Sequence, residues 1–91
     1  MKIEKKPTYI KSLQNILRYI ANDKIAAAQN FEQALNKKIK SLVDFPLMYH
    51  RSFYFKNEAY RDMEHKGYTI IYKVEGELIS ILEIFKWQNV L

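Results

Sequence analysis

Residues 67–85 read GYTIIYKVEGELISILEIF, and this stretch decides the fold of the chain. Its many β-branched and aromatic residues favour two β-strands. Gly76 lies between the two runs, where it can take the positive φ angle that a tight reversal needs. Lys66-Gly67 forms a second turn just before the first run. The nearly continuous apolar content predicts central strands that other parts of the chain cover on at least one face.

Two helices are expected to provide this cover. Apolar side chains recur at helical spacing over residues 10–20 and again over residues 25–42. Thr8 and Asp23 are candidate N-caps of the two helices, and Phe45-Pro46 closes the second one. Because roughly two or three residues separate them, the helices, of roughly 13 and 20 residues, are predicted to form an antiparallel hairpin.

The remaining segments complete an α+β fold. Residues 1–6 alternate weakly and predict a short edge strand, and residues 59–65 alternate as a third strand, with Arg61, Met63 and His65 on one side. Residues 47–57 are compatible with either a loop or a short strand. The chain, residues 1–91, is predicted to be a single domain with the order β-α-α-β-β-β. A helical hairpin packs on one face of a small, mainly antiparallel sheet, and the opposite face is expected to be bare.

The composition narrows the functional classes. The sequence has no cysteine, which excludes disulfides and thiolate metal sites, and no spacing of His, Asp and Glu indicates a metal or cofactor. No apolar run approaches membrane-spanning length and the first residues lack the apolar core of a signal peptide, so a cytoplasmic protein is expected. The net charge of +5 comes from residues 1–45, because residues 46–91 hold six basic and six acidic residues. A basic helical half favours a nucleic-acid or acidic-protein partner, while a solvated lysine face that aids solubility would explain each lysine equally well.

Three segments carry a family resemblance when they are taken in order: Leu42-Val43-Asp44-Phe45-Pro46, then Tyr60-Arg61-Asp62-Met63, then residues 67–74. Together they resemble the RelE/ParE family, the toxins of bacterial type II toxin–antitoxin (plasmid stabilisation) modules. The resemblance implies a compact toxin that is neutralised by a cognate antitoxin, which wraps an extended or helical acidic segment around it. It also implies that the chain contacts DNA only indirectly, through the antitoxin.

The residues favour one branch of this family. RelE-like members cleave mRNA on the ribosome, which needs converging Arg or Lys groups and an acid–base side chain. Such members commonly carry an arginine directly after the Gly-Tyr pair, where this chain has Thr69, and some end with a helix bearing a catalytic tyrosine, where this chain stops at Leu91. ParE-like members bind DNA gyrase and need no nuclease site. The resemblance therefore implies a gyrase-binding toxin, with a ribosome-dependent mRNA endonuclease as the alternative.

Two groups of residues are candidates for function. Under the nuclease alternative the candidate catalytic residues are His50, Arg61, His65 and Lys86, although ion pairing or ordinary loop polarity would also explain them. Four aromatic residues fall within residues 49–55, which is typical of a protein interface, while a lid over the core would explain them equally well. The candidate partner-binding residues are Tyr49, Arg51, Phe53, Tyr54, Phe55, Lys86 and Trp87.

Overall fold

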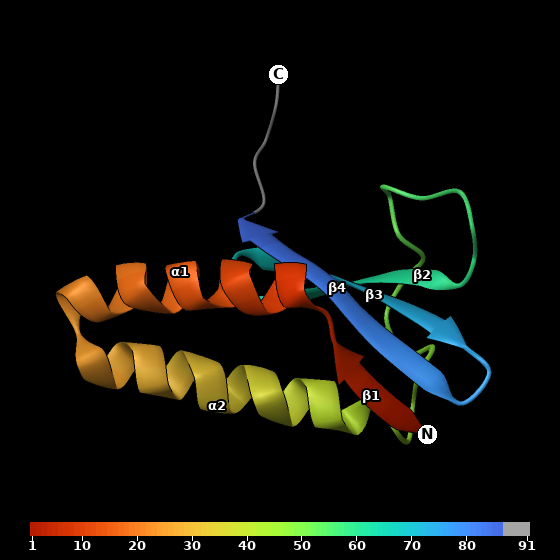
Figure 1. Cartoon of the computed structure of the whole chain (residues 1–91), viewed down its shortest axis with the longest axis horizontal. Helices are drawn as coiled ribbons and strands as arrows, with labels where there is room; N and C mark the ends of the chain where they lie inside the picture. Colours follow the sequence, from red (N-terminus) through yellow and green to blue (C-terminus); the bar gives the residue numbers. More distant parts are fainter. Residues whose placement is uncertain (87–91) are drawn as a thin grey trace.

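The computed structural model describes residues 1–86 and confirms the predicted order of elements (Figure 1). The elements are β1 (Lys2–Lys5), α1 (Pro7–Asp23), α2 (Ile25–Ser41), β2 (Tyr60–His65), β3 (Tyr68–Glu75) and β4 (Leu78–Lys86). The fold is therefore α+β, with a helical hairpin inserted between the first strand and the last three. Within residues 1–86 neither helix combines the length and the apolar character needed to cross a membrane.

The four strands form one sheet in the order β1-β4-β3-β2. β1 runs parallel to β4 and the other neighbours are antiparallel, so the sheet is mainly antiparallel, as predicted. Both predicted turns are present, because Lys66 and Gly67 have φ angles of 50° and 86°, and Gly76 has a φ angle of 57°. Two successive left-handed residues at Lys66 and Gly67 suit the twist of the strands that they join.

The helix boundaries differ from the prediction. α1 begins at Pro7, in the first-turn position that proline favours, and neither helix has a side-chain cap, so the assignment of Thr8 and Asp23 as N-caps was wrong. Asp23 is instead the last residue of α1, and Lys24 alone separates the two helices. Both helices have 17 residues. α2 ends at Ser41 and is followed by turn residues, so it stops several residues before Phe45-Pro46, where the prediction had ended it.

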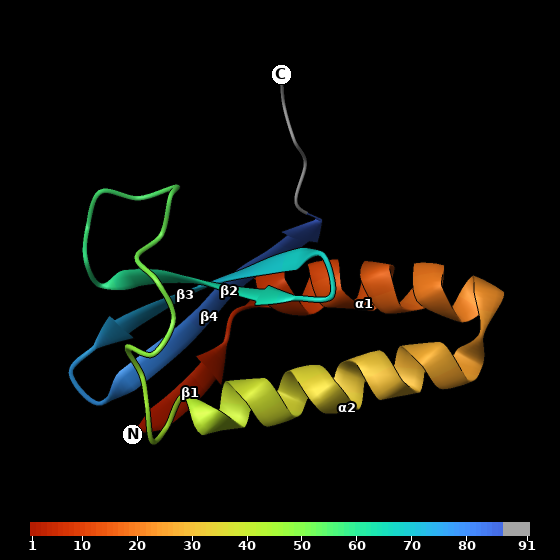
Figure 2. The same ribbon diagram turned by 180° about the vertical axis from the view of Figure 1, so that it is seen from behind.

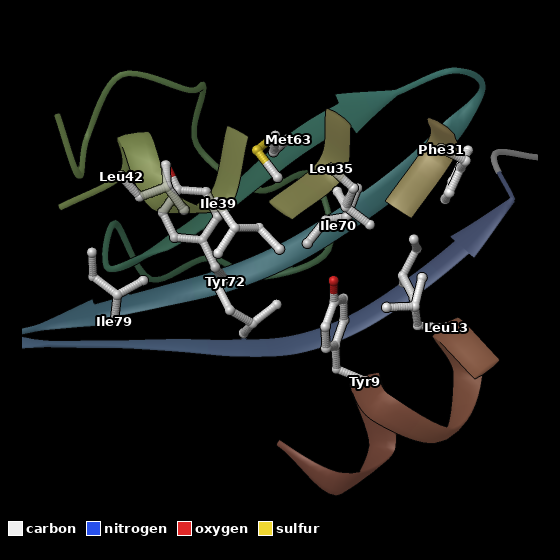
Figure 3. Packing of buried hydrophobic residues seen from close by; sticks show 12 residues of the cluster. Tyr9, Leu13, Phe31, Leu35, Ile39, Leu42, Met63, Ile70, Tyr72 and Ile79 are labelled. Carbon is white, nitrogen blue, oxygen red and sulfur yellow. The ribbon is translucent and has the colours of Figure 1, made fainter. Parts of the chain in front are cut away.

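The hydrophobic core lies between the helical hairpin and one face of the sheet (Figure 3). Each apolar stripe that was predicted on a helix meets one face of the central strands. The core residues alternate along β3, whereas in β4 the irregularity opposite Ile71 and Tyr72 shifts the alternation by one residue between Ile81 and Ile84. The buried residues of this core are Tyr9, Leu13, Phe31, Leu35, Ile39, Leu42, Met63, Ile70, Tyr72, Ile79, Ile81 and Ile84. The helical hairpin extends well beyond the sheet, and the junction between its two helices lies at the tip of this extension (Figure 1).

The opposite face of the sheet is not bare, which corrects the prediction. The segment between α2 and β2, residues 42–59, folds back around the outer edge of β2 and onto this face (Figure 2). The Tyr72 hydroxyl, on the helix side, donates a hydrogen bond to the Pro46 carbonyl at 2.8 Å, while the ring of Tyr54 packs edge-on against Phe85 on the other side. Asp62 and Thr69 are buried on this face. Residues 42–59 therefore act as a partial second cover.

Candidate functional site

Residues 50–53 are attached to β2 through the backbone. The Asp62 amide donates to the His50 carbonyl at 3.1 Å, and the Ser52 amide donates to the Tyr60 carbonyl at 2.9 Å. The Phe53 amide donates to the Asp62 carboxylate at 3.0 Å, and that side chain is only 1% exposed. These bonds close the outer edge of β2, which would otherwise present unpaired amide and carbonyl groups. Residues 47–57 thus form a loop that one isolated antiparallel bridge, between Arg51 and Arg61, holds on β2. Of the two predicted alternatives, a loop or a short strand, the loop is correct.

This attachment presents three aromatic side chains to solvent. Phe53 is 85% exposed, Tyr54 is 50% exposed and Phe55 is 43% exposed. Each ring packs on a different neighbour: Phe53 lies 4.9 Å from His50, Tyr54 packs 5.2 Å from Phe85, and Phe55 stacks on Tyr60 with ring centroids 4.0 Å apart. We call Phe53, Tyr54 and Phe55 the aromatic loop surface. The same segment between α2 and β2 carries further exposed apolar side chains that the sequence analysis did not single out as candidates, namely Phe45, Leu47 and Met48.

The other candidate partner-binding residues are distributed differently. Tyr49 is half-buried beside the core, and Arg51 forms an exposed ion pair with Glu58 at 3.4 Å. Lys86 lies at the exposed end of β4, where it pairs in register with Tyr68. Trp87 lies outside the described residues. Of the predicted contact residues that the structure describes, Phe53, Tyr54 and Phe55 are three successive aromatic side chains that remain at least 43% exposed.

His50 lies beside this surface in an exposed position. Its Nε2 atom is 2.9 Å from a Glu64 carboxylate oxygen, and its Nδ1 atom is 2.9 Å from the Arg51 carbonyl oxygen. The hydrogen bond to Glu64, followed by that to the Arg51 carbonyl, raises the pKa of His50 because both favour the protonated ring. The His50 ring also contacts Phe53, with centroids 4.9 Å apart.

His65 has the opposite environment. It is 2% exposed, on the helix-facing side with Met63, and its ring packs edge-on against Phe31 at 4.8 Å. Its Nε2 atom lies 3.3 Å from the Phe31 carbonyl, to which it donates in the neutral form. Burial, followed by the positive charge of Lys38, lowers the pKa of His65. The ring is therefore neutral at pH 7 and lies away from solvent.

The four candidate catalytic residues do not converge within residues 1–86. Arg61 points a guanidinium nitrogen at the Tyr49 carbonyl, 3.2 Å away, near the start of β2. His50 lies on Glu64, and His65 lies in the core. Lys86 lies at the end of β4, separated from His65 by Tyr68 in the same row of the sheet. A phosphoryl-transfer site needs such groups around one reacting atom. This arrangement places them in four separate environments.

A second surface feature is a groove between β1 and α2. It has a volume of about 670 Å³ and is lined by Ile3, Lys5, Asn36, Lys37, Ile39 and Lys40. We call it the lysine groove. Lys5 donates a hydrogen bond to the Asn36 side chain at 3.2 Å, which joins the two walls. The excess of lysine in residues 1–45 predicted a basic surface, but nothing in the sequence placed residues 3–5 beside residues 36–40.

Comparisons with known proteins agree with this architecture. The family model described as "ParE toxin of type II toxin-antitoxin system, parDE" matches residues 3–89. Among solved structures, a chain described as "Chromosomal ParDE TA system from P. aeruginosa" superposes with a TM-score of 0.76, at 16% sequence identity, over 97% of this chain and 97% of that chain. At this identity the structural likeness is one of fold. No curated protein sequence matches.

Proposed function

This chain belongs to the ParE toxin family of type II toxin–antitoxin systems, and on that premise we propose that it arrests growth in the cytoplasm by binding DNA gyrase. The observation that carries the proposal is the aromatic loop surface. Its rings are exposed, yet the amide bonds to β2 hold the chain beneath them. Aromatic residues in such positions dominate the binding energy of many protein interfaces, and a pre-ordered loop loses less entropy on binding.

A binding mechanism is favoured over cleavage of mRNA by the dispersal of the candidate catalytic groups. Activation of a ribose hydroxyl and stabilisation of an anionic phosphorane require a base and cations within reach of the same phosphate. Among residues 1–86 the buried ring of His65 cannot meet the exposed His50, and Arg61 is engaged by a backbone carbonyl. Binding to gyrase needs none of these groups.

The toxin has a cognate antitoxin as its partner, and we place the antitoxin's acidic segment in the lysine groove. The two sheet edges support this placement, because residues 50–52 close the edge at β2, while β1 has no strand on its outer side within residues 1–86. The Lys2 and Lys6 amides donate toward β4, so alternation along the strand turns the amides of Ile3 and Lys5 outward, into the groove. An extended acidic segment can pair with this edge while its carboxylates meet the lysines.

A supercoiling assay with purified gyrase tests the target. The wild-type chain is expected to inhibit supercoiling, and Phe53→Ser is expected to raise the half-inhibitory concentration about tenfold, because truncation of an exposed aromatic anchor removes a central contact. Phe53 is 85% exposed, so its replacement leaves the core intact. The matched control is Ile25→Ser, which removes a 69% exposed apolar side chain at the start of α2, at the tip of the helical hairpin (Figure 1).

The outcomes separate the two mechanisms. Equal losses for Phe53→Ser and Ile25→Ser would remove the aromatic loop surface from the mechanism while leaving gyrase as the target. A wild-type chain that leaves supercoiling unaffected but cuts ribosome-bound mRNA would replace the proposal with the endonuclease alternative. Addition of the antitoxin should restore supercoiling in every case in which the toxin inhibits it.

A further inference from the structure

The contact between the aromatic loop surface and β2 contains a titratable group at its centre. Both ring nitrogens of His50 face oxygen acceptors, the Glu64 carboxylate and the Arg51 carbonyl, each at 2.9 Å. A neutral imidazole carries a single N–H and can donate to only one of them, whereas the protonated ring donates to both. The complete set of hydrogen bonds therefore exists only when His50 is charged.

The same residue connects three parts of the loop attachment. Its carbonyl accepts the Asp62 amide, its ring contacts the ring of Phe53, and its Nε2 atom reaches β2 at Glu64. The Phe53 amide is bound in turn by the Asp62 carboxylate, directly below. Deprotonation removes one of the two ring hydrogen bonds, and thus weakens the attachment of the segment that carries the most exposed aromatic side chain.

We propose that His50 and Glu64 form a proton-dependent latch, which holds Phe53 and its neighbours on β2 while the imidazole is protonated and releases them as it loses its proton. Other charged groups surround the latch on every element that packs near it. Asp62 adds a second negative charge on β2, and Lys38 of α2 donates to the Glu64 carbonyl at 3.0 Å. Two arginines are also near: Arg51 pairs with Glu58 within the loop, and Arg61 of β2 donates to the Tyr49 carbonyl.

The direction of the pH effect follows from the raised pKa of His50, which the Glu64 hydrogen bond and then the Arg51 carbonyl produce. A histidine whose folded-state pKa exceeds its unfolded-state value contributes stability that is complete below the unfolded value, about 6.5. That contribution is lost as the pH rises through the folded-state pKa. The latch is therefore closed in mildly acidic solution and opens as the pH rises through the raised pKa of His50.

NMR spectroscopy of the isolated chain tests the latch without gyrase. Titration of the His50 ring is expected to show a pKa above 6.5 in the wild type and a lower pKa in Glu64→Gln, which keeps the side-chain shape and removes the charge. Hydrogen-exchange protection factors of the Ser52, Phe53 and Asp62 amides should fall about two- to fivefold across the His50 titration, the size expected for an exposed ion pair. In Glu64→Gln they should be low and independent of pH.

The control variant is Glu58→Gln, which removes the same kind of carboxylate from the other ion pair of the loop and should leave the pKa of His50 unchanged. A wild-type His50 that titrates at or below 6.5, or amide protection that does not change with pH, would overturn the latch. The effect of the latch on gyrase rests on the proposed function, and the NMR result does not. A toxin that ignores gyrase but shows the titration keeps the latch and loses the target.

Discussion

Simultaneous replacement of Lys5, Lys37 and Lys40 by glutamate is expected to weaken binding of the cognate antitoxin about a hundredfold. These lysines line one groove, whose floor contains the apolar side chains of Ile3 and Ile39. Reversal of a charge converts an attraction into a repulsion, which costs about 1 kcal/mol at a solvent-exposed rim. Three such sites cost about 3 kcal/mol, which corresponds to about two orders of magnitude in affinity.

Isothermal titration calorimetry with the purified antitoxin measures this loss. The matched control reverses three exposed lysines outside the groove, Lys11, Lys24 and Lys56, so that both variants change the net charge equally. The control should lose affinity only severalfold, through the long-range field, and this loss should shrink as added salt screens the field. Equal losses in the two variants would show that net charge, and not the groove, governs capture of the antitoxin. Full affinity in the groove variant would place the antitoxin elsewhere.

A rise in pH from 9 to 12 is expected to remove about 5 kcal/mol of stability through two tyrosines, Tyr9 and Tyr72. Both are fully buried, and burial raises the pKa of each phenol from 10 to about 12. Burial in the core disfavours the charged phenolate and leaves the neutral phenol as the stable form. Its stabilising effect is complete below pH 10 and is lost between pH 10 and 12, because the unfolded chain gives up these protons first. Two groups shifted by about 2 pH units each give this loss.

Urea unfolding at pH 9 and pH 12 measures the effect, and the two phenylalanine variants serve as controls. Tyr72→Phe removes the hydrogen bond to the Pro46 carbonyl and should cost about 1 kcal/mol at neutral pH. Tyr9→Phe should be neutral or stabilising there, because the Tyr9 hydroxyl is buried without a partner among the described residues. The double variant should lose most of the alkaline sensitivity. An equally steep loss in the double variant would assign it to other groups.

Local patterns predicted most of the secondary structure, because each pattern records how one segment distributes its apolar side chains. The alternation in residues 59–65 correctly placed Met63 and His65 on one face of a strand, and both side chains are buried against the helices. The predicted N-caps were wrong, because the residue type alone does not fix where a helix begins. Thr8 and Asp23 are suitable capping residues, but a helix also begins where its first turn packs, and α1 starts one residue earlier at Pro7.

The candidate sites were much harder to predict, because they depend on which distant segments meet. The sequence showed four aromatic residues near residue 50, but it left open whether they close the core or face solvent. The structure divides them, since Tyr49 packs beside the core while Phe53 projects outward. Likewise, His50 and His65 looked equivalent as proton carriers, and only their surroundings distinguish an exposed ring on a carboxylate from a ring buried against Phe31.

The sequence by itself determined the elements, their order, both reversals in the terminal sheet and the basic character of the helical half. Only the tertiary structure decided that residues 42–59 close one sheet edge, that β1 and α2 enclose a lysine-lined groove, and that His50 meets Glu64. The physical reason is that periodicity and turn chemistry act between neighbours in the chain, whereas an edge, a groove or an ion pair joins groups that only folding brings together.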